Sequence, residues 1–227
     1  MGVRVDLHIW SLTETADAAI LSADETARMD RFVYPKHRQA FLAARAGLRR
    51  VLGASCGIDP ADLQFSYGPQ GKPAMSDGPR FNLSHTGDLA CLALHTDIAL
   101  GVDIEAFRTV EDGIAERFFS PVEHATLTAL PPSAQQAGFF RCWTRKESVI
   151  KALGGGLSIP LDAFDVTLDP CSAALTRLEP DYGRADDWAL APFQIGPKMM
   201  GCVAAQTGGA SITLEVKSAP PGVNLNA

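Results

Sequence analysis

The pattern of hydrophobic and polar positions predicts a strand and two helices at the start of the chain. Residues 3–10 alternate between apolar and polar, as an opening strand does. Ser22 is followed three residues later by Glu25, which is typical of a capping box, and we expect a short helix through Arg31.

A longer helix is predicted to begin at Pro35. Apolar residues recur at helical spacing after it, and Gly53 is expected to end the helix. The other face of this helix carries Arg38, Arg45 and Arg49.

Short apolar runs separated by turn residues follow and predict a small sheet. The runs are 63–67, 80–85, 89–94 and 98–105, with the loop GPQGKP at 68–73. Helical spacing then returns at 114–119 and 121–130, and a long helix is expected from about Ser133 to Leu153, ended by Gly154 to Gly156. Strand patterns close the sequence at 162–168, 187–193, 199–206 and 211–216.

The order of a long helix followed by three or four strands thus occurs twice, with the seam near Gly101. This repetition of elements predicts an α+β fold of two similar halves packed against each other, residues 1–102 and 103–227. Ligands usually bind in clefts between such halves, so we expect the active site at their interface.

Composition narrows the classes of function. The chain of 227 residues has 20 Lys and Arg against 26 Asp and Glu, a net charge of -6, which disfavours nucleic acid and anionic membranes as partners. No apolar run approaches the roughly 20 residues of a membrane span, and Asp6 and His8 interrupt the first apolar stretch, unlike in a signal peptide. The five cysteines show no C-x-x-C spacing. We therefore expect a cytoplasmic protein with reduced thiols.

Acidic residues near the seam are candidates for chemistry. Asp103 and Glu105 are one residue apart at the end of an apolar strand, so both carboxylates lie on the same side. Trp143, Glu147 and Lys151 recur every fourth residue and share one helical face. Each pattern has an ordinary alternative: Asp103 and Glu105 could simply be solvated at the end of a strand, and Glu147 and Lys151 could form a surface salt bridge. The second alternative does not explain why a tryptophan, Trp143, lies on the same polar face.

If the seam brings Asp103, Glu105 and Glu147 together, the three carboxylates form an all-oxygen site suited to Mg²⁺ or Mn²⁺. Magnesium usually completes its coordination shell with water and substrate phosphates. This hypothesis therefore points to phosphate or pyrophosphate chemistry.

Candidate phosphate-binding groups lie in the first half. Lys72 lies in a Gly-Lys-Pro turn, and Ser84 and His85 close a predicted strand. Arg28 and Arg31 are three residues apart on one predicted helical face. Each has an ordinary alternative: a soluble turn for Lys72, a bond to a backbone carbonyl for His85, and solvation for the arginines.

Five motifs in order resemble the 4′-phosphopantetheinyl transferases, specifically their larger monomeric, surfactin-synthetase-activating branch. They are GKP at 71–73, FNLSHTG at 81–87, GVDIE at 101–105, RFFSPVE at 117–123 and WTRKESVIKALGGGL at 143–157. The resemblance implies a monomeric pseudodimer with coenzyme A in the cleft. It also implies Mg²⁺-dependent transfer of phosphopantetheine from coenzyme A to a serine of an apo acyl or peptidyl carrier protein.

By this resemblance, Asp103, Glu105 and Glu147 match the metal-binding carboxylates, and Glu147 and Lys151 are the expected catalytic residues. The positions expected to bind coenzyme A are Arg28, Arg31, Lys72, Ser84, His85, Asp103 and Lys151. The sequence departs from the family pattern at Thr86, where a serine is usual, and at Gln70, where some relatives have an aromatic.

Two further hypotheses concern partners and rivals. An apolar patch around Phe118, Phe119 and Met29 is predicted to dock the carrier. A magnesium-dependent pyrophosphatase would use the same acidic residues, and a noncatalytic scaffold would bind coenzyme A without turnover. No P-loop or kinase motif supports another phosphotransferase.

Overall fold

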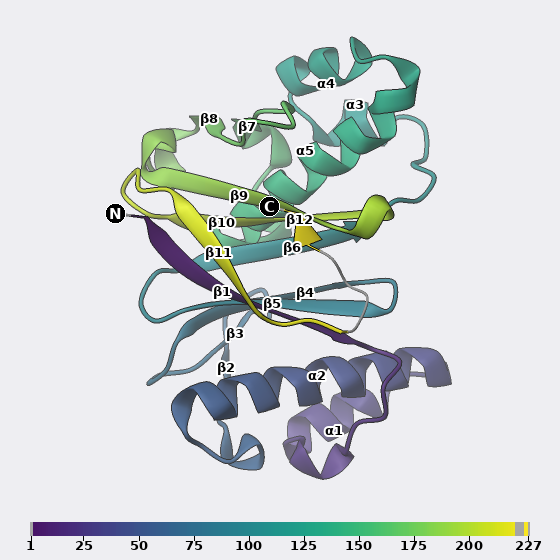
Figure 1. The fold of residues 1–227 in the computed structure, drawn as a ribbon, viewed down its shortest axis with the longest axis vertical. Helices are drawn as coiled ribbons and strands as arrows, with labels where there is room; N and C mark the ends of the chain where they lie inside the picture. Colours follow the sequence, from purple (N-terminus) through teal and green to yellow (C-terminus); the bar gives the residue numbers. More distant parts are fainter. Residues whose placement is uncertain (1, 221–224, 227) are drawn as a thin grey trace.

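The computed structural model describes residues 2–220 and 225–226 of the chain. Helices and sheets form four layers, with two sheets packed face to face and helices on both outer sides (Figure 1). The first half contributes β1 (Val3–Ser11), α1 (Ala23–Met29), α2 (Pro35–Cys56), β2 (Ser66–Tyr67), β3 (Pro73–Ala74), β4 (Arg80–Thr86) and β5 (Leu89–His95). The rest comprises β6 (Leu100–Ala106), α3 (Ile114–Phe118), α4 (Pro121–Thr128), α5 (Pro132–Leu153), β7 (Phe164–Val166), β8 (Leu175–Leu178), β9 (Trp188–Ile195), β10 (Met199–Gln206), β11 (Ile212–Ser218) and β12 (Leu225–Asn226).

The α+β class and the two halves are confirmed. One sheet has the strand order β11-β1-β5-β4 and the other β12-β9-β10-β6. Strand β11, from the end of the sequence, pairs in parallel with β1 in the first sheet. Strand β6 spans the predicted boundary between residues 102 and 103 and belongs as a whole to the second sheet. The division at that boundary stays a prediction.

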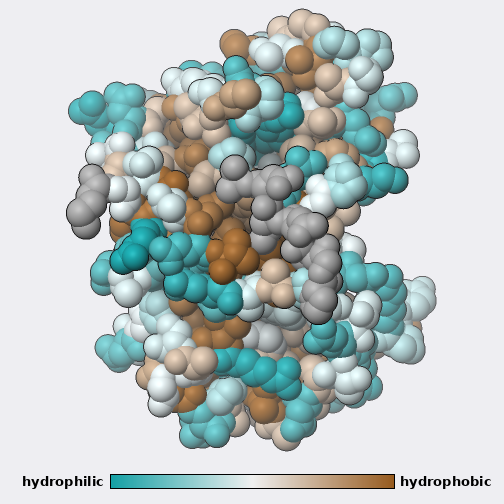
Figure 2. Space-filling model, viewed as in Figure 1, coloured by the Kyte–Doolittle hydropathy of each residue, from teal (hydrophilic) through white to brown (hydrophobic). Residues whose placement is uncertain are grey.

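Hydrophobic side chains from both sheets meet in the central core. Val5, Leu7 and Ile9 of β1 lie against Val102 and Ile104 of β6 in one buried cluster. The alternation along β6 thus turns its apolar residues towards this core, as the sequence predicted. Hydrophobic residues are visible at the level of the sheets on the face in Figure 2.

The predicted helix ends are only partly correct. Ser22 and Glu25 form the expected capping box, and Gly154, with φ 76°, ends α5 as predicted. The prediction that Gly53 ends α2 is wrong, because the helix continues to Cys56 and Gly57 takes the left-handed conformation with φ 68°. A Cβ at position 53 would lie 2.7 Å from the Ile58 carbonyl oxygen, so close packing is what this glycine permits.

Buried ion pairs connect helices in both outer layers. Arg45 and Arg49, expected on the polar face of α2, are buried and donate to Glu25 of α1, with Arg49 Nε 2.6 Å from Glu25 Oε2. On the other side, Lys146 Nζ of α5 lies 2.7 Å from Glu123 Oε1 of α4, and both side chains are 1% exposed. Such charges remain buried because each is paired and hydrogen-bonded.

Replacing Lys146 with Met should destabilise the protein by about 3–5 kcal/mol, because Glu123 would be left as an unpaired buried charge. Urea unfolding measures this change. The control is Asp30→Asn, which removes the partner of Arg38 in an exposed pair and should cost at most about 1 kcal/mol. Equal losses in both variants would contradict the assignment.

A glycine brings the second sheet into contact with α5. A Cβ on Gly101 of β6 would lie 2.1 Å from the Ser148 carbonyl oxygen and 2.4 Å from the Ala152 backbone nitrogen. No side chain fits at this crossing without movement of the backbone. The crossing therefore fixes how closely β6 approaches the last turns of α5.

Gly101→Ala should lower the free energy of unfolding by about 3 kcal/mol, since the added methyl would push β6 away from α5. The control is Gly68→Ala, where the nearest atom to the new Cβ, the Lys72 carbonyl oxygen, is 3.8 Å away. The unfolding midpoint of each variant in urea is the measurement. Unchanged stability in Gly101→Ala would mean that the crossing is not tightly packed.

In the part of the chain that the structure describes, no helix has the length and apolar character needed to cross a membrane.

Candidate functional site

Polar side chains of β4 join the two halves along the seam. Asn82 Oδ1 accepts from the Val102 N–H of β6 at 2.8 Å, Ser84 Oγ from Ile104 at 3.3 Å, and Thr86 Oγ1 from Ala106 at 3.2 Å. Because side chains alternate along a strand, these three face the same edge. The two sheets are thus joined by side chains at their edge strands, directly beside the acidic residues.

Asp103 lies at the centre of the site. Its side chain is 6% exposed, and its Oδ1 accepts from Lys151 Nζ at 2.6 Å and from Ser84 Oγ at 3.1 Å. Its Oδ2 is buried and has no hydrogen-bond partner among the described residues. Burial raises the pKa of Asp103 to about 6, although Lys151 opposes this shift.

The other two candidate metal ligands flank Asp103. Glu105 is half-buried, accepts from Thr86 Oγ1 at 3.4 Å and pairs with Arg108 NH1 at 2.5 Å. Glu147 is half-buried on α5, and burial raises its pKa, with Lys151 opposing and Glu105 adding to the shift. Lys151 therefore pairs with Asp103 of β6 and reaches Ser84 of the first half, and the Glu147–Lys151 surface bridge is not what holds it.

The ligand type of Asp103, Glu105 and Glu147 suits a divalent cation, but the three carboxylates are not close enough together to coordinate one. Among the described residues, no three His, Cys, Asp or Glu side chains are gathered closely enough to hold a metal ion. However, Glu147 and Glu105 both raise the pKa of Asp103, so the three carboxylates act on one another electrostatically. The partnerless Asp103 Oδ2 is an available oxygen donor, and an all-carboxylate set suits Mg²⁺ or Mn²⁺.

The remaining candidate phosphate ligands are less uniform. Ser84 is buried and receives a hydrogen bond from Lys151 Nζ at 3.0 Å, whereas His85 is exposed. Desolvation of the His85 ring, and then the charge of Lys151, lower the His85 pKa. Lys72 is half-buried, and its ammonium donates to two backbone carbonyls.

The two arginines lie at the far end of the first half. Arg28 is in α1 with its guanidinium 5.6 Å from the centre of the Phe41 ring. The prediction that Arg31 shares its helical face is wrong, because α1 ends at Met29 and Arg31 follows in a turn. The Asp30 cap is where the helix stops.

Two adjoining cavities connect these groups. One of about 310 Å³ spans the seam and has Glu147 and Lys151 in its wall, and one of about 480 Å³ has Arg28 and His85 in its wall. They share four lining residues: Gly71, Pro73, Asn82 and Leu83. A ligand with widely separated charged groups could therefore contact both cavities.

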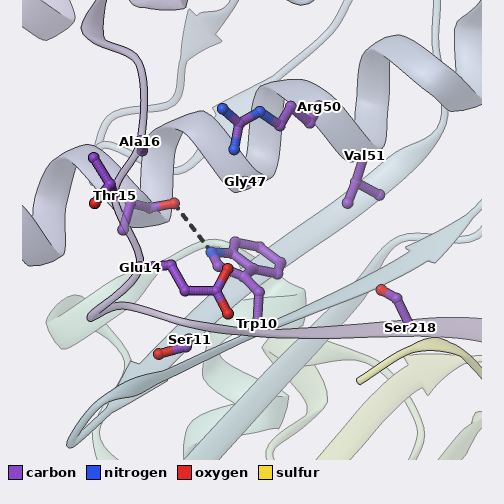
Figure 3. Close-up of a pocket in the computed structure, with 10 residues that line it drawn as sticks. Trp10, Ser11, Glu14, Thr15, Ala16, Gly47, Arg50, Val51 and Ser218 are labelled. Atoms are coloured by element: carbon purple, nitrogen blue, oxygen red, sulfur yellow. Dashed lines mark hydrogen bonds between the residues drawn. The ribbon is translucent and has the colours of Figure 1, made fainter. Parts of the chain in front are cut away.

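Figure 3 shows a separate hollow between α2 and β1. The Trp10 indole N–H donates to the Ala43 carbonyl there at 3.0 Å, and a Cβ on Gly47 would lie 2.3 Å from the indole ring. None of the predicted site residues lines it. The hollow is therefore not part of the seam site.

The predicted docking patch is wrong. Met29 and Phe119 are each only 4% exposed and belong to two different hydrophobic clusters, so they cannot form one apolar surface. Phe118 and Phe119 pack instead around Trp143, which stacks on Phe139 at 5.7 Å. This aromatic packing explains the tryptophan on the Glu147 face.

Sequence reasoning missed Asn82 and Thr86 as seam residues and the pairing of Glu123 with Lys146. The alternation of Asn82, Ser84 and Thr86 was a usable signal, because it places three hydrogen-bonding side chains on one edge. Glu123 and Lys146 lie within two of the motifs, but their distance in sequence gives no sign that they pair.

Comparisons with known proteins agree with the two halves. A family model described as the 4′-phosphopantetheinyl transferase superfamily matches residues 99–193. A second model, described as 4′-phosphopantetheinyl transferase, N-terminal, matches residues 11–97.

Curated relatives extend over most of the chain. The 4′-phosphopantetheinyl transferase HetI of a Nostoc species is 38% identical over 216 residues, covering 85% of this chain and 91% of the relative. Sfp of Bacillus subtilis is 31% identical over 200 residues, covering 81% and 89%. AcpT of Salmonella typhimurium is 34% identical over 192 residues, covering 83% and 91%.

Proposed function

Because this chain belongs to the 4′-phosphopantetheinyl transferase superfamily, we propose that it moves phosphopantetheine from coenzyme A to a serine of an apo acyl or peptidyl carrier protein. The products are the holo carrier protein and adenosine 3′,5′-bisphosphate. The observation that carries the proposal is the ion pair of the buried Asp103 with the half-buried Lys151 beside the seam, with Glu147 in the wall of the adjoining cavity. This arrangement supports the proposal, because a carboxylate and an ammonium line a cavity to which both halves contribute residues.

Asp103, Glu105 and Glu147 would hold Mg²⁺, or Mn²⁺ in its place. A divalent cation so bound supplies charge neutralisation for the pyrophosphate of coenzyme A. The buried, partnerless Asp103 Oδ2 supports this assignment.

Glu147 accepts the proton of the acceptor serine in the proposed reaction. Burial raises the pKa of Glu147, which makes this carboxylate a stronger base than a solvated one. The serine oxygen attacks the β-phosphorus, a new P–O bond forms, and the bond to the bridging oxygen breaks. Lys151 stabilises the negative charge on the leaving adenosine 3′,5′-bisphosphate.

Coenzyme A binding follows the two cavities. Ser84 and His85 would contact its phosphates near Lys151, and Arg28, in the wall of the larger cavity, would bind the 3′-phosphate at the other end. Arg31 is given the same role by the resemblance alone. Lys72 lies in the wall of the seam cavity between them. We place this activity in the cytoplasm, because the net charge of -6 and the scattered free cysteines suit neither membrane surfaces nor a disulfide framework. A monomer is what the resemblance to the larger branch of the family implies.

The test is the intact mass of a purified apo carrier protein after incubation with this protein, coenzyme A and Mg²⁺, with a chelator control. The expected result is a gain of one phosphopantetheine that the chelator abolishes. Coenzyme A cleaved with the carrier unchanged would indicate a pyrophosphatase. Coenzyme A bound without turnover, across carriers of several classes, would indicate a scaffold.

A further inference from the structure

The Lys72 side chain reaches across the seam and binds backbone atoms. Its Nζ donates to the Leu100 carbonyl at 3.0 Å and to the Lys151 carbonyl at 2.6 Å. Lys72 belongs to the loop between β2 and β3, Leu100 begins β6, and Lys151 lies in the last turn of α5. One ammonium group therefore connects a loop of the first half to strand β6 of the second sheet and to helix α5, which packs against that sheet.

The Lys151 carbonyl is one that the helix itself cannot satisfy. The last four carbonyls of an α-helix have no partner within the helix, and a cation near them is favourable because of the helix dipole. In α5 the Ile150 carbonyl accepts from the Gly154 N–H at 2.9 Å. Lys72 supplies the donor for the next carbonyl along, and so caps α5 from another part of the chain.

The close crossing of β6 and α5 explains why one ammonium can reach both carbonyls. Gly101, next to Leu100, lies directly against the last turns of α5, where a Cβ would be 2.9 Å from the Lys151 carbonyl carbon. Burial at this crossing lowers the pKa of Lys72 to about 8. A partly desolvated ammonium is stabilised by the carbonyls it contacts, and those carbonyls would lose their donor without it.

Lys151 is consequently held at both of its ends. Its backbone carbonyl is bound by Lys72, and its Nζ is bound by Asp103 Oδ1 and Ser84 Oγ. We propose that Lys72 is a positioning residue, which sets the place of Lys151 through the backbone of α5 and not by contact with coenzyme A. This inference rests on the proposed function, in which Lys151 acts on the leaving group.

A kinetic comparison separates a positioning residue from a phosphate ligand. Lys72→Met should lower kcat about ten- to hundredfold, as a lost positioning contact does, while KM for coenzyme A stays within about threefold. The matched control is Lys198→Met, the same change at an exposed lysine, with kcat and KM unaltered. A raised KM with unchanged kcat would show that Lys72 binds phosphate, and would overturn the inference.

A double variant tests whether Lys72 acts through Lys151. If it does, Lys72→Met added to Lys151→Met causes no further loss of kcat, because residues that act as a unit are not additive. Losses that multiply would mean that the two lysines act independently, against the inference.

Amide hydrogen exchange provides a readout that needs no turnover. In Lys72→Met, peptides covering residues 148–156 should exchange faster than in the unaltered protein, while those of α2 keep their protection. Unchanged exchange at 148–156 would overturn the inference even in an active transferase, and faster exchange would support it even if no carrier is modified. Should Lys72→Met fail to fold, Lys72→Gln, whose amide keeps N–H donors but is shorter and uncharged, should show the same changes in exchange and kcat to a smaller extent, and no change in either would overturn the inference.

Discussion

Glu147→Gln is expected to reduce phosphopantetheine transfer at least about a thousandfold, the largest effect of any single substitution considered. Two losses combine in this variant. The amide cannot accept the proton of the acceptor serine, and it is a poorer ligand for a divalent cation than a carboxylate. General-base assistance alone contributes about 10²- to 10⁴-fold, so removing both functions exceeds what either would cost.

The fold should survive this change. Glu147 is half-buried and its burial raises the pKa of the carboxyl, so a neutral amide of the same shape is tolerated there. The measurement is the initial rate of holo carrier formation at saturating Mg²⁺, alongside the unfolding midpoint. Glu116→Gln, which neutralises an exposed glutamate of α3, is the control and should leave the rate unchanged. Near-normal turnover of Glu147→Gln would remove it from the catalytic role.

Lys151→Met is expected to lower kcat about 10²- to 10³-fold, because the charge that stabilises the leaving phosphate is lost. The same change also removes a 2.6 Å ion pair from Asp103, which is buried. Without the cation the pKa of Asp103 rises further above its usual range, since Lys151 is what opposes the effect of burial. Cation binding by Asp103 should therefore weaken too.

Ser84→Ala provides the matched comparison for Lys151→Met. Both variants remove a donor to the same oxygen of Asp103, but the serine hydroxyl is neutral. A hydrogen bond to a charged group contributes about 1.5–3 kcal/mol, so its loss should reduce kcat by about ten- to hundredfold, less than the loss of the Lys151 charge. Single-turnover rates of holo carrier formation with coenzyme A in excess distinguish the two. If Ser84→Ala were the more damaging variant, the leaving-group role of Lys151 would be contradicted.

Local patterns in the sequence predicted most of the elements. The capping box at Ser22 and the stop at Gly154 were predicted correctly because their signals lie within a few neighbouring residues. Gly53 was misread because a glycine can end a helix or admit a close neighbour, and only the nearby Ile58 carbonyl decides between them. The sequence around Gly53 therefore cannot distinguish a helix end from a site of close packing.

Contacts between distant segments were the part that local patterns could not supply. Arg45 and Arg49 have helical spacing that suits a solvated face. Both are buried instead, and each donates a hydrogen bond to Glu25 of α1. Met29 and Phe119 were grouped as one surface because both are apolar, yet burial places them in separate clusters.

The candidate site shows the same division. The strand alternation correctly placed Asp103 and Glu105 apart from the apolar face of β6, whereas the pairing of Asp103 with Lys151 depended on how β6 packs against α5. The binding of Lys72 to two carbonyls had no sequence signal, because backbone acceptors are identical at every residue.

The parallel pairing of β11 with β1 has a consequence for synthesis on the ribosome. Strand β1 is translated well before β11, and β5 can cover one of its edges in the meantime. Its other edge has no partner until Ser218, the last residue of β11, has been translated. An uncovered strand edge is a template for pairing with other chains, so nascent molecules are exposed to misassembly until β11 has been made. Chaperones that shield strand edges should therefore improve the yield of this protein more than faster folding of either half would.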